Sequence, residues 1–348
     1  MNQNRWNNRL CFLIIILITF ASFQCGQDNE PPLIQIFHAP DSFSRRSQDF
    51  TANITGALSY KVRNARYRVN NTHWFDIRQD QKRVPPPYFT IELFAEQLYD
   101  GLNTVNIAAS TQNEQVDTTV TLHFKYDPRP ISFPVVVNWE NAKLDVYDGY
   151  WERILDRDGV WRVRPKPGFE DYDRILVVTG ATLEGRRIET DMIFRYGNKR
   201  KPYGFGILPL WGGSPDERGF SPRRGWNFGI AWYYSPEGGV GLSYSYKDGD
   251  SVPNSISKYH DFEIEQNIRY RVIVEAWSEQ DADKQHLHYR QRLKWWKEND
   301  RPPSEWIELS DVGGAPLPPG EFAVALIAHR CQIEFGPVVV KSLQNIIK

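Results

Sequence analysis

Cysteine is scarce in this chain of 348 residues, and its scarcity removes one common way of stabilising a secreted fold. Cys11 lies in an N-terminal apolar run and Cys25 lies at the end of that run, which leaves Cys331 alone in the body of the chain. The mature protein therefore has no disulfide framework. We expect Cys331 to be a small, buried hydrophobic residue.

An excess of charge is also missing, because 42 basic residues stand against 43 acidic ones. A general electrostatic attraction to nucleic acid is therefore not expected. The sequence lacks a Walker loop, a His-Glu-x-x-His motif and a Gly-x-Ser-x-Gly motif. Gly204 and Gly206 form a Gly-x-Gly, but it lies inside a strand pattern without the context of a phosphate loop. No cofactor requirement follows from these patterns.

The residues that are abundant favour β-structure. Aromatic residues make up 14% of the sequence, glycine and proline number 24 and 23, and methionine numbers 2. This mixture is poor for helices and good for strands joined by tight turns. The length is enough for two domains at about 150 residues each.

Residues 1–24 have the pattern of a signal peptide. Two arginines precede the apolar run Leu10–Phe23, whose length suits a secretory segment better than a membrane span. The run ends at Cys25, and the segment resembles a bacterial lipoprotein signal, in which that cysteine becomes the lipidated first residue. A polar tether, residues 25–30, follows, and Gly26 implies the outer membrane by the same resemblance. If Cys25 is not lipidated, secretion or an uncleaved anchor is the alternative.

Residues 31–128 are expected to form an antiparallel β-sandwich. Short strands separated by turns are indicated at Leu33–Phe37, Val62–Asp76 and Thr118–Tyr126. The segment Leu98–Ala109 resembles the corner and late strand of bacterial immunoglobulin-like domains, where a Gly-x-Asn turn leads into an alternating apolar strand. Such domains act as spacers, and binding of a partner is the alternative. Alternating prolines at Asp127–Pro130 predict a stiff connection to the next domain.

Residues 131–348 are expected to form a larger, jelly-roll β-sandwich, because strand patterns follow one another with little room for helices. The predicted strands are Phe133–Asn138, Arg174–Thr179, Arg187–Arg195, Tyr203–Trp211, Trp226–Tyr234, Gly241–Tyr246, Tyr270–Trp277, His286–Trp296 and Glu321–Gln332. Turn signals at Asp156–Gly159, Pro236–Gly239 and Asp248–Asp250 separate several of them.

The second domain carries a family resemblance. Its closing strands look like those of concanavalin A-like lectin/glucanase domains, including LamG-like jelly rolls: Glu321–His329, Gln332–Phe335 and Val338–Val340. Four further pieces are similar to the early strands of that superfamily: Trp151, Trp161, Arg174–Gly180 and Glu189–Met192. The resemblance implies a carbohydrate-binding or carbohydrate-active fold with its ligand on the concave sheet. It also implies that calcium can bind in the loops, although Asp156–Gly159 and Asp248–Asp250 are more simply turns.

The pattern at Gly225–Tyr234 alternates large and small side chains with the period of a strand. Its large face contains Trp226, Phe228, Ile230, Trp232 and Tyr234. Because a sugar's C–H face lies well against an aromatic ring, four side chains are candidates for stacking on a glycan: Trp211, Trp232, Tyr234 and Trp277. For any single one, a place in the core is the alternative, but at least one is expected to line a groove.

Two carboxylates follow each other on one face of the predicted strand Arg187–Arg195. Glu189 and Asp191 lie about 6.6 Å apart, a separation typical of glycosidic acid/base pairs. They match the first two positions of the Glu-x-Asp-x-Glu pattern of laminarinase-like glucanases, but a hydrophobic residue stands where the third carboxylate belongs. The alternative is that Arg187 and Arg195 form structural ion pairs with them.

The predicted strand His286–Trp296 carries a strip of basic side chains. One face of the strand would carry His286, His288, Arg290, Arg292 and Lys294. If the strand forms a hairpin with its predecessor, the same face also receives Arg271, Glu275 and Trp277. Such a strip suits a carboxylated or sulfated glycan, because guanidinium groups bind these anions in bidentate fashion. A solvated convex face is the alternative, and a zinc site formed by His286, His288 and Glu275 is a further one.

These patterns together predict an all-β, lipid-anchored cell-surface protein that binds a polysaccharide. The residues expected to meet in one open trough are Glu189, Asp191, Arg195, Trp211, Trp232, Tyr234, Glu275, Trp277, His286, His288 and Arg290. The incomplete carboxylate pattern weighs against catalysis. A glycoside hydrolase remains an alternative, as does a polysaccharide lyase using Arg290, His288 and Tyr289. A structural adhesin with a protein partner is the third hypothesis.

Overall fold

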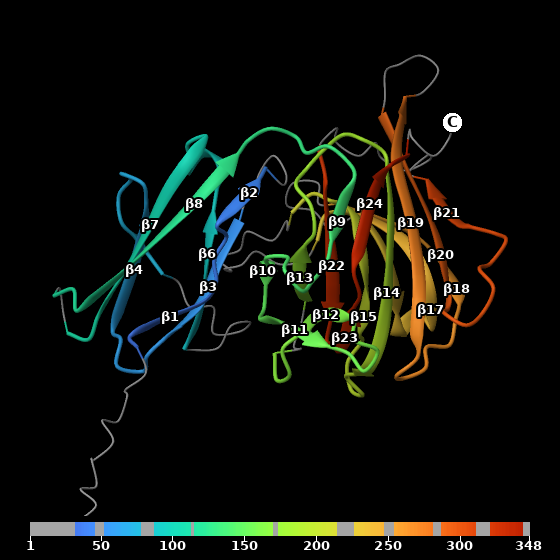
Figure 1. Ribbon diagram of the computed structural model, residues 1–348, viewed down its shortest axis with the longest axis horizontal. Coiled ribbons are helices and arrows are strands. Elements are labelled where there is room, and N and C mark those ends of the chain that lie inside the picture. The colour runs from blue at the N-terminus through green and yellow to red at the C-terminus, as the bar shows by residue number, and fades with distance from the viewer. Residues whose placement is uncertain are drawn as a thin grey trace, which may run out of the picture. The chain divides into compact units, whose positions relative to one another are not determined.

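The computed structural model describes residues 32–45, 52–77, 87–112, 115–169, 173–213, 226–246, 254–280, 287–310 and 321–343. Their secondary structure is almost entirely β-strand, and they form a small sandwich followed by a larger one (Figure 1), which confirms the predicted fold class. Within these ranges, no helix is long and apolar enough to cross a membrane. The predicted signal segment, Cys25 and His286 lie outside the described residues.

The smaller sandwich has two sheets. The first contains, in order, β1 (Ile34–His38), β3 (Ala52–Leu58) and β6 (Tyr88–Leu93). The second contains β2 (Ser42–Ser44), β8 (Thr118–Asp127), β7 (Gly101–Ser110), β4 (Asn64–Val69) and β5 (Phe75–Asp76). The two sheets share a hydrophobic core in which Ile54, Phe89, Ile107 and Phe124 are at most 1% exposed. Burial of such side chains is the main force that holds two sheets together.

The Gly-x-Asn corner of this sandwich is held by the side chain of Asn103. Its Oδ1 accepts a hydrogen bond from the backbone N–H of Tyr99 at 2.8 Å, and its Nδ2 donates to the backbone oxygens of Tyr99 and Gly101 at 2.8 and 3.0 Å. Asn70, in the left-handed conformation with φ 51°, donates from Nδ2 to the same Oδ1 at 2.9 Å. The two amides thus satisfy backbone groups that the turn leaves outside the ladder, which fixes where β7 begins.

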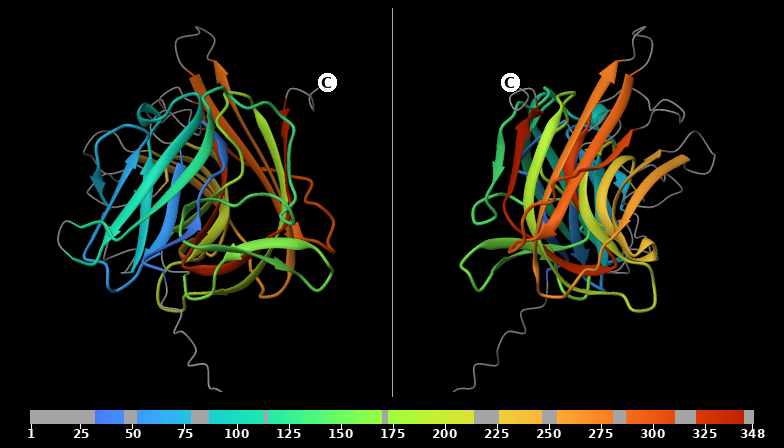
Figure 2. Two further views of the ribbon diagram at one scale, coloured as in Figure 1. Left: turned by 60° about the vertical axis from the view of Figure 1, so that its left-hand side comes forward. Right: turned by 90° about the vertical axis from the view of Figure 1, so that its right-hand side faces the viewer.

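The larger sandwich also has two sheets, which form separate layers (Figure 2). The seven-stranded sheet contains β10 (Asp145–Asp148), β13 (Asp173–Val177), β22 (Ala323–His329), β15 (Gly204–Trp211), β16 (Phe228–Tyr234), β17 (Gly239–Tyr246) and β18 (Asn254–Asp261). The nine-stranded sheet contains β11 (Trp151–Leu155), β12 (Trp161–Pro165), β23 (Cys331–Phe335), β14 (Arg186–Gly197), β19 (Arg269–Gln280), β20 (Leu287–Lys297) and β21 (Ile307–Ser310), and β24 (Val338–Ser342) joins β14 to β9 (Val135–Val137).

The main core lies between these two sheets. On β14, Ile188, Met192 and Phe194 point into it, as the alternation of that strand predicts. Cys331 is 1% exposed in the same core, which confirms the expectation of a small buried residue.

A second hydrophobic cluster covers the opposite face of the seven-stranded sheet. Its members alternate along their strands with residues of the main core, and they include Tyr147, Ile175, Leu208, Trp211, Ile230, Trp232 and Ile327. The sheet is therefore apolar on both faces, whereas an antiparallel sheet with one solvated face shows a polar outer side. Most of the large face predicted at Gly225–Tyr234 belongs to this outer cluster.

The chain passes from one large sheet to the other through a single residue. β22 ends at His329 in the seven-stranded sheet, and β23 begins at Cys331 in the nine-stranded sheet. Arg330 between them has φ 52°, in the left-handed region that few non-glycine residues adopt. The prediction of one strand over Glu321–Gln332 is therefore wrong, because this residue divides it into two strands on different sheets.

Candidate functional site

Four aromatic side chains form a shelf on the outer face of the seven-stranded sheet: Trp226, Trp232, Tyr234 and Tyr259. The rings of Trp232 and Tyr234 are stacked, with centroids 4.5 Å apart and an interplanar angle of 8°. Trp226 meets Trp232 edge-on at 6.0 Å. Trp232 is 7% exposed, while the other three are partly exposed. We call these four residues the aromatic shelf.

Glycines on the strands beside β16 let the rings lie against the sheet. A Cβ atom at Gly204 of β15 would be 2.8 Å from the Trp232 ring. A Cβ atom at Gly241 of β17 would be 2.5 Å from Cδ1 of Tyr259. Both distances are too short for a real side chain, so the aromatic rings occupy space that any other residue at these positions would take.

The hydroxyl group of Tyr259 is held by Trp232, another member of the aromatic shelf. The indole Nε1 of Trp232 donates a hydrogen bond to the Tyr259 hydroxyl at 2.7 Å. Burial raises the pKa of Tyr259 to about 12, although this hydrogen bond acts in the opposite direction. The phenol is therefore protonated at neutral pH and keeps its own O–H available to donate.

Charged groups lie at the β22 side of the shelf. Gly204 is paired with Tyr234 on one side and with His329 on the other, so His329 and Tyr234 flank the same glycine. Nδ1 of His329 is 2.6 Å from Oδ1 of Asp173. Burial raises the pKa of Tyr234 and the charge of Arg330 acts against that rise, so the guanidinium group lies within electrostatic reach of the phenol. The apolar shelf thus has a polar and charged border.

Trp211 lies at the covered end of the same outer face. It is 0% exposed, and its ring meets that of Tyr147 edge-on at 4.9 Å. Tyr147 is in turn covered from the smaller sandwich, where Nδ2 of Asn53 donates to its backbone oxygen at 2.5 Å. Trp211 therefore offers no ring face to a ligand in this structure, although the sequence made it a stacking candidate.

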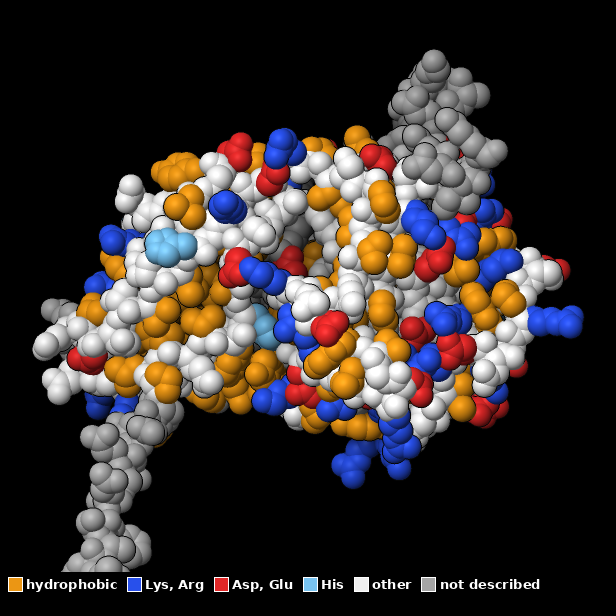
Figure 3. Space-filling view, in the orientation of Figure 1, with side chains coloured by type: hydrophobic (Ala, Val, Ile, Leu, Met, Phe, Trp, Pro, Cys, Tyr) orange, Lys and Arg blue, Asp and Glu red, His pale blue; other side chains and the backbone are white. Residues whose placement is uncertain are grey.

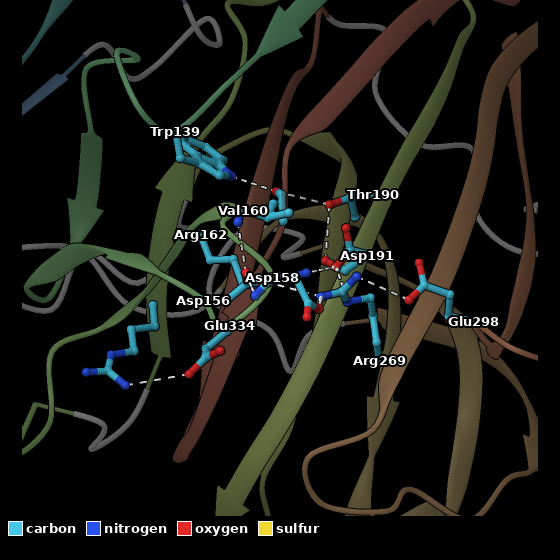
Figure 4. A network of polar contacts seen from close by, with 12 residues as sticks. Trp139, Asp156, Asp158, Val160, Arg162, Thr190, Asp191, Arg269, Glu298 and Glu334 are labelled. Atoms are coloured by element: carbon cyan, nitrogen blue, oxygen red, sulfur yellow. Dashed lines mark hydrogen bonds and ion pairs between the residues drawn. The ribbon is translucent and has the colours of Figure 1, made fainter.

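The carboxylates predicted on β14 lie on the other large sheet, and Figure 4 shows Asp191 beside Arg162 and Arg269. Asp191 is 2.5 Å from Nη2 of Arg162, whose side chain is 0% exposed. Arg162 also contacts Asp156 through Nε at 2.6 Å. Arg269 lies 3.7 Å from Asp191 and 3.2 Å from Asp156. Buried charges of this kind are stable only as a set, because removal of one partner leaves the other uncompensated.

Glu189 is also held by an ion pair. Nε of Arg187 is 2.7 Å from Glu189, and Nη1 of the same arginine is 2.8 Å from Glu275. Glu275 is fully buried and has a second partner in Arg292 at 2.5 Å. Burial acts to raise the pKa of Glu189, but the hydrogen bond and charge of Arg187 outweigh it and the pKa is lowered. A glycosidic acid needs a raised pKa, so Glu189 is unsuited to that role at neutral pH.

The predicted hairpin and its basic strip are present, on the outer face of the nine-stranded sheet that also carries Glu189 and Asp191. β19 pairs with β20, which places Trp277 opposite Arg290 and Glu279 opposite His288. Arg290 forms an ion pair with Glu279 at 2.6 Å. Tyr289 is 2% exposed in the main core, on the other side of the sheet. The lyase arrangement predicted from the sequence is therefore wrong, since Tyr289 cannot act beside His288 and Arg290.

Of the metal sites considered from the sequence, Asp248–Asp250 lies outside the described residues, and the zinc site and the Asp156–Gly159 site do not fit this geometry. Glu275 lies opposite Arg292 and His288 lies opposite Glu279, a separation of four residues, or about 13 Å, along the strand. Glu275 and His288 therefore cannot share a zinc ion. Asp156 accepts two backbone N–H groups and faces arginines, which suits no further cation. Among the described residues, no group of three or more His, Cys, Asp or Glu could hold a metal ion.

The residues predicted to meet in one trough are divided between two outer faces with the main core between them. Trp211, Trp232 and Tyr234 belong to the seven-stranded sheet. The nine-stranded sheet carries Glu189, Asp191, Arg195, Glu275, Trp277, His288 and Arg290. Arg195 there pairs with Glu334 at 2.7 Å, and basic and acidic side chains are interspersed over the face shown in Figure 3. The expectation of a single trough is wrong, and the sequence reasoning also missed Tyr259 and the role of the glycines.

Comparisons with known proteins give only a distant likeness. No protein-family model and no curated protein matches the chain. The carbohydrate-binding module CBM66 from Bacillus subtilis is similar over 57% of this chain and 95% of the module, with 17% identity and a TM-score of 0.36. A beta-glucuronidase from Bacteroides uniformis is similar over 90% of this chain but only 30% of the enzyme, with 6% identity and a TM-score of 0.23. At these values neither likeness carries an inference about what this chain binds.

Proposed function

We propose that this protein binds a glycan on the aromatic shelf of its larger sandwich. The observation that carries the proposal is the partly exposed ring of Tyr234, which is stacked on the buried ring of Trp232 and bordered by polar groups. A pyranose ring has an apolar C–H face and a rim of hydroxyl groups. A flat aromatic surface with donors and acceptors at its edge matches both parts, because stacking buries the apolar face while the rim keeps its hydrogen bonds.

We propose that the protein binds the glycan without cleaving it, and the positions of the carboxylates support this. Glu189, Asp191 and Glu275 are each paired with arginine, and they lie on a different sheet from the shelf. The hydrolase alternative needs a pair of carboxyl groups beside the bound sugar, and Asp173 at the border of the shelf is engaged by His329 at 2.6 Å. An assay for reducing sugar and for unsaturated products, run with any glycan that binds, separates the two: sustained product release would favour an enzyme.

We further propose that the protein works at the cell envelope. The N-terminal pattern supports lipidation at Cys25, and the smaller sandwich, which resembles a spacer in sequence, would hold the shelf away from the membrane. Mass spectrometry of the mature N-terminus tests the anchor. An unmodified start at another residue would contradict the anchor and would leave the glycan site untouched.

The binding proposal is tested with the full-length protein on an array of polysaccharides and oligosaccharides, followed by calorimetric titration of the best ligand. The Tyr234→Ala variant is expected to lose about tenfold or more in affinity, because an aromatic anchor of a binding site contributes about 2 kcal/mol. Tyr60→Ala removes a ring that is 86% exposed elsewhere and is expected to bind normally. Absence of binding to any glycan, or full binding by Tyr234→Ala, would overturn the proposal.

A further inference from the structure

A basic cavity lies where two turns of the larger sandwich meet, and neither the fold nor the shelf accounts for it. Its volume is about 600 Å³. The lining side chains that can contact a ligand are Lys199, Arg200, Lys201, Arg330, Tyr196 and Asn198. Among the described residues, the lining contains four cationic side chains and no acidic one.

The backbone holds these cations in place. Oδ1 of Asn198 accepts hydrogen bonds from the backbone N–H groups of Arg200 and Lys201 at 2.9 and 3.1 Å. The backbone N–H of Asn198 donates to the backbone oxygen of Arg330 at 3.0 Å. The turn between β14 and β15 is therefore tied to the turn between β22 and β23. Backbone geometry thus brings Lys199, Lys201 and Arg330 together.

This arrangement contrasts with the outer face of the nine-stranded sheet. On that face Arg162, Arg187 and Arg195 each have a carboxylate partner at 2.5 to 2.7 Å. In the cavity, the described part of the chain supplies no carboxylate partner for Lys199 or Lys201. Like charges gathered in a concave site raise the local concentration of anions.

The cavity adjoins the aromatic shelf. Arg330 lines the cavity and directly follows His329, which is paired with Gly204. Gly204 is paired on its other side with Tyr234 of the shelf, so the row from Tyr234 to His329 crosses two strand spacings, or about 9.6 Å. A chain of linked sugars that lies on the shelf therefore has the cavity within its reach.

We propose that the cavity binds the carboxylate or sulfate groups of an acidic polysaccharide whose sugar rings stack on the aromatic shelf. The inference rests on the glycan binding proposed above and adds the class of glycan. Guanidinium and ammonium groups form strong, charge-assisted hydrogen bonds with such anions. A volume of about 600 Å³ fits a sugar residue with its charged substituent. Tyr196, 48% exposed in the lining, adds a ring face beside the charges.

The test compares three oligosaccharides of equal length, one neutral, one rich in uronate and one sulfated, by titration against the full-length protein at low and high salt. The acidic ligands are expected to bind at least about tenfold more tightly at low salt, and this advantage shrinks as salt screens the charges. The triple variant Lys199→Gln, Lys201→Gln, Arg330→Gln is expected to lose that advantage and to keep its affinity for the neutral ligand. Comparison of the two acidic arms identifies the anion.

A matched control removes a cation from the other face of the sandwich. Arg290, whose side chain is 44% exposed, lies on the basic strip of β20, and Arg290→Gln is expected to bind all three ligands normally. Circular dichroism checks the fold of the triple variant. Should it fail to fold, the double variant at the exposed positions Lys199 and Lys201 takes its place, with a loss of the acidic advantage by about threefold or more expected.

The outcomes separate this inference from the function on which it rests. Equal affinity of the unmodified protein for neutral and acidic ligands overturns the anion site and leaves glycan binding in place. Absence of binding to every saccharide overturns both. Unchanged acidic preference in the triple variant, or its transfer to Arg290→Gln, overturns the assignment of the cavity. Displacement of the acidic ligand by an equal concentration of inorganic sulfate would mean that the cavity takes small anions alone, and it would also overturn the inference.

Discussion

Trp232 and Tyr259 are joined by a hydrogen bond of 2.7 Å that crosses from β16 to β18 over the intervening strand. The indole N–H is the donor and the phenolic oxygen is the acceptor, so the contact fixes the orientation of both rings. A ligand therefore meets a surface whose rotamers are already set. Less conformational entropy is lost on binding to such a surface, which favours affinity.

Removal of the Tyr259 hydroxyl should weaken this surface without removing its rings. In Tyr259→Phe the buried N–H of Trp232 loses its acceptor, and the free energy of unfolding is expected to fall by about 1–3 kcal/mol. Glycan affinity is expected to fall as well, because the phenol's own donor is lost. Urea unfolding and calorimetry measure the two effects. Tyr99→Phe, at a ring 60% exposed, is the control, and equal stability of the two variants would contradict the prediction.

Substitutions at the two carboxylates of β14 should have unequal costs. Asp191→Asn leaves the fully buried charge of Arg162 with Asp156 but without its second carboxylate partner, and it is expected to destabilise the protein by about 3 kcal/mol. Glu189→Gln is expected to lower the free energy of unfolding by about 1 kcal/mol or less, because the Glu189 side chain is 35% exposed and water screens its ion pair. Denaturant unfolding measures both. A catalytic carboxylate pair would give the reverse result, with activity lost and stability little changed.

Acid should destabilise the fold through His38. Burial and then the charge of Arg153 lower its pKa from 6.5 to about 4, and its Nε2 is buried without a hydrogen-bond partner among the described residues. The unfolded chain takes up the proton near pH 6.5 but the folded chain only near pH 4, so protonation favours unfolding. The stabilising effect is complete above pH 6.5 and is lost as the pH falls through 4.

The measurement compares the unmodified protein with His38→Gln. Between pH 7 and pH 4 the unmodified protein is expected to lose on the order of 3 kcal/mol more stability than the variant does. Other groups titrate equally in both proteins and cancel in the difference. Parallel stability curves for the two proteins over this range would show that His38 is not buried in its neutral form.

A methyl group added under the shelf should disturb it. A Cβ atom at Gly206 would be 2.2 Å from the backbone oxygen of Ala231 and 2.6 Å from Cα of Trp232, neither of which can move alone. Gly206→Ala is therefore expected to destabilise the protein by about 1–3 kcal/mol and to weaken glycan binding. Gly229→Ala is the control, because the nearest atom there is the side-chain oxygen of Gln291 at 3.0 Å. Thermal unfolding measures the change in stability, and calorimetric titration measures the change in glycan affinity.

The alternation of side chains predicted correctly which residues share a face of a strand. It placed Ile188 and Met192 in the core, and it placed Glu275 and Arg292 together on the outer side of the hairpin of β19 and β20. Neighbours in that hairpin are close in sequence, so local pattern was enough. The strands on either side of Trp232, β15 and β17, are also neighbours in sequence, but β15 pairs on its other side with β22, from a distant part of the chain. Pattern alone predicts no such pairing and gives no means of assigning a strand to a sheet.

Two parts of the shelf were missed for physical reasons. β18, which carries Tyr259, is an edge strand whose sequence is largely polar, so it has little of the apolar alternation that marks a strand. Gly204 and Gly206 were visible as a Gly-x-Gly inside a strand, a pattern that signals close approach of another group. That signal identifies a place where something packs closely, but it does not reveal that aromatic rings fill the place.

The glycines under the rings have a consequence for anyone who maps this surface by mutation. Alanine scanning detects residues that contribute to binding by truncating their side chains, and Gly204 and Gly241 have no side chain to truncate. These positions would instead stand out in a saturation library as places that reject even the smallest addition. The contour of the aromatic shelf therefore depends on residues that have no side chain, and a redesign of that contour would begin at these glycines.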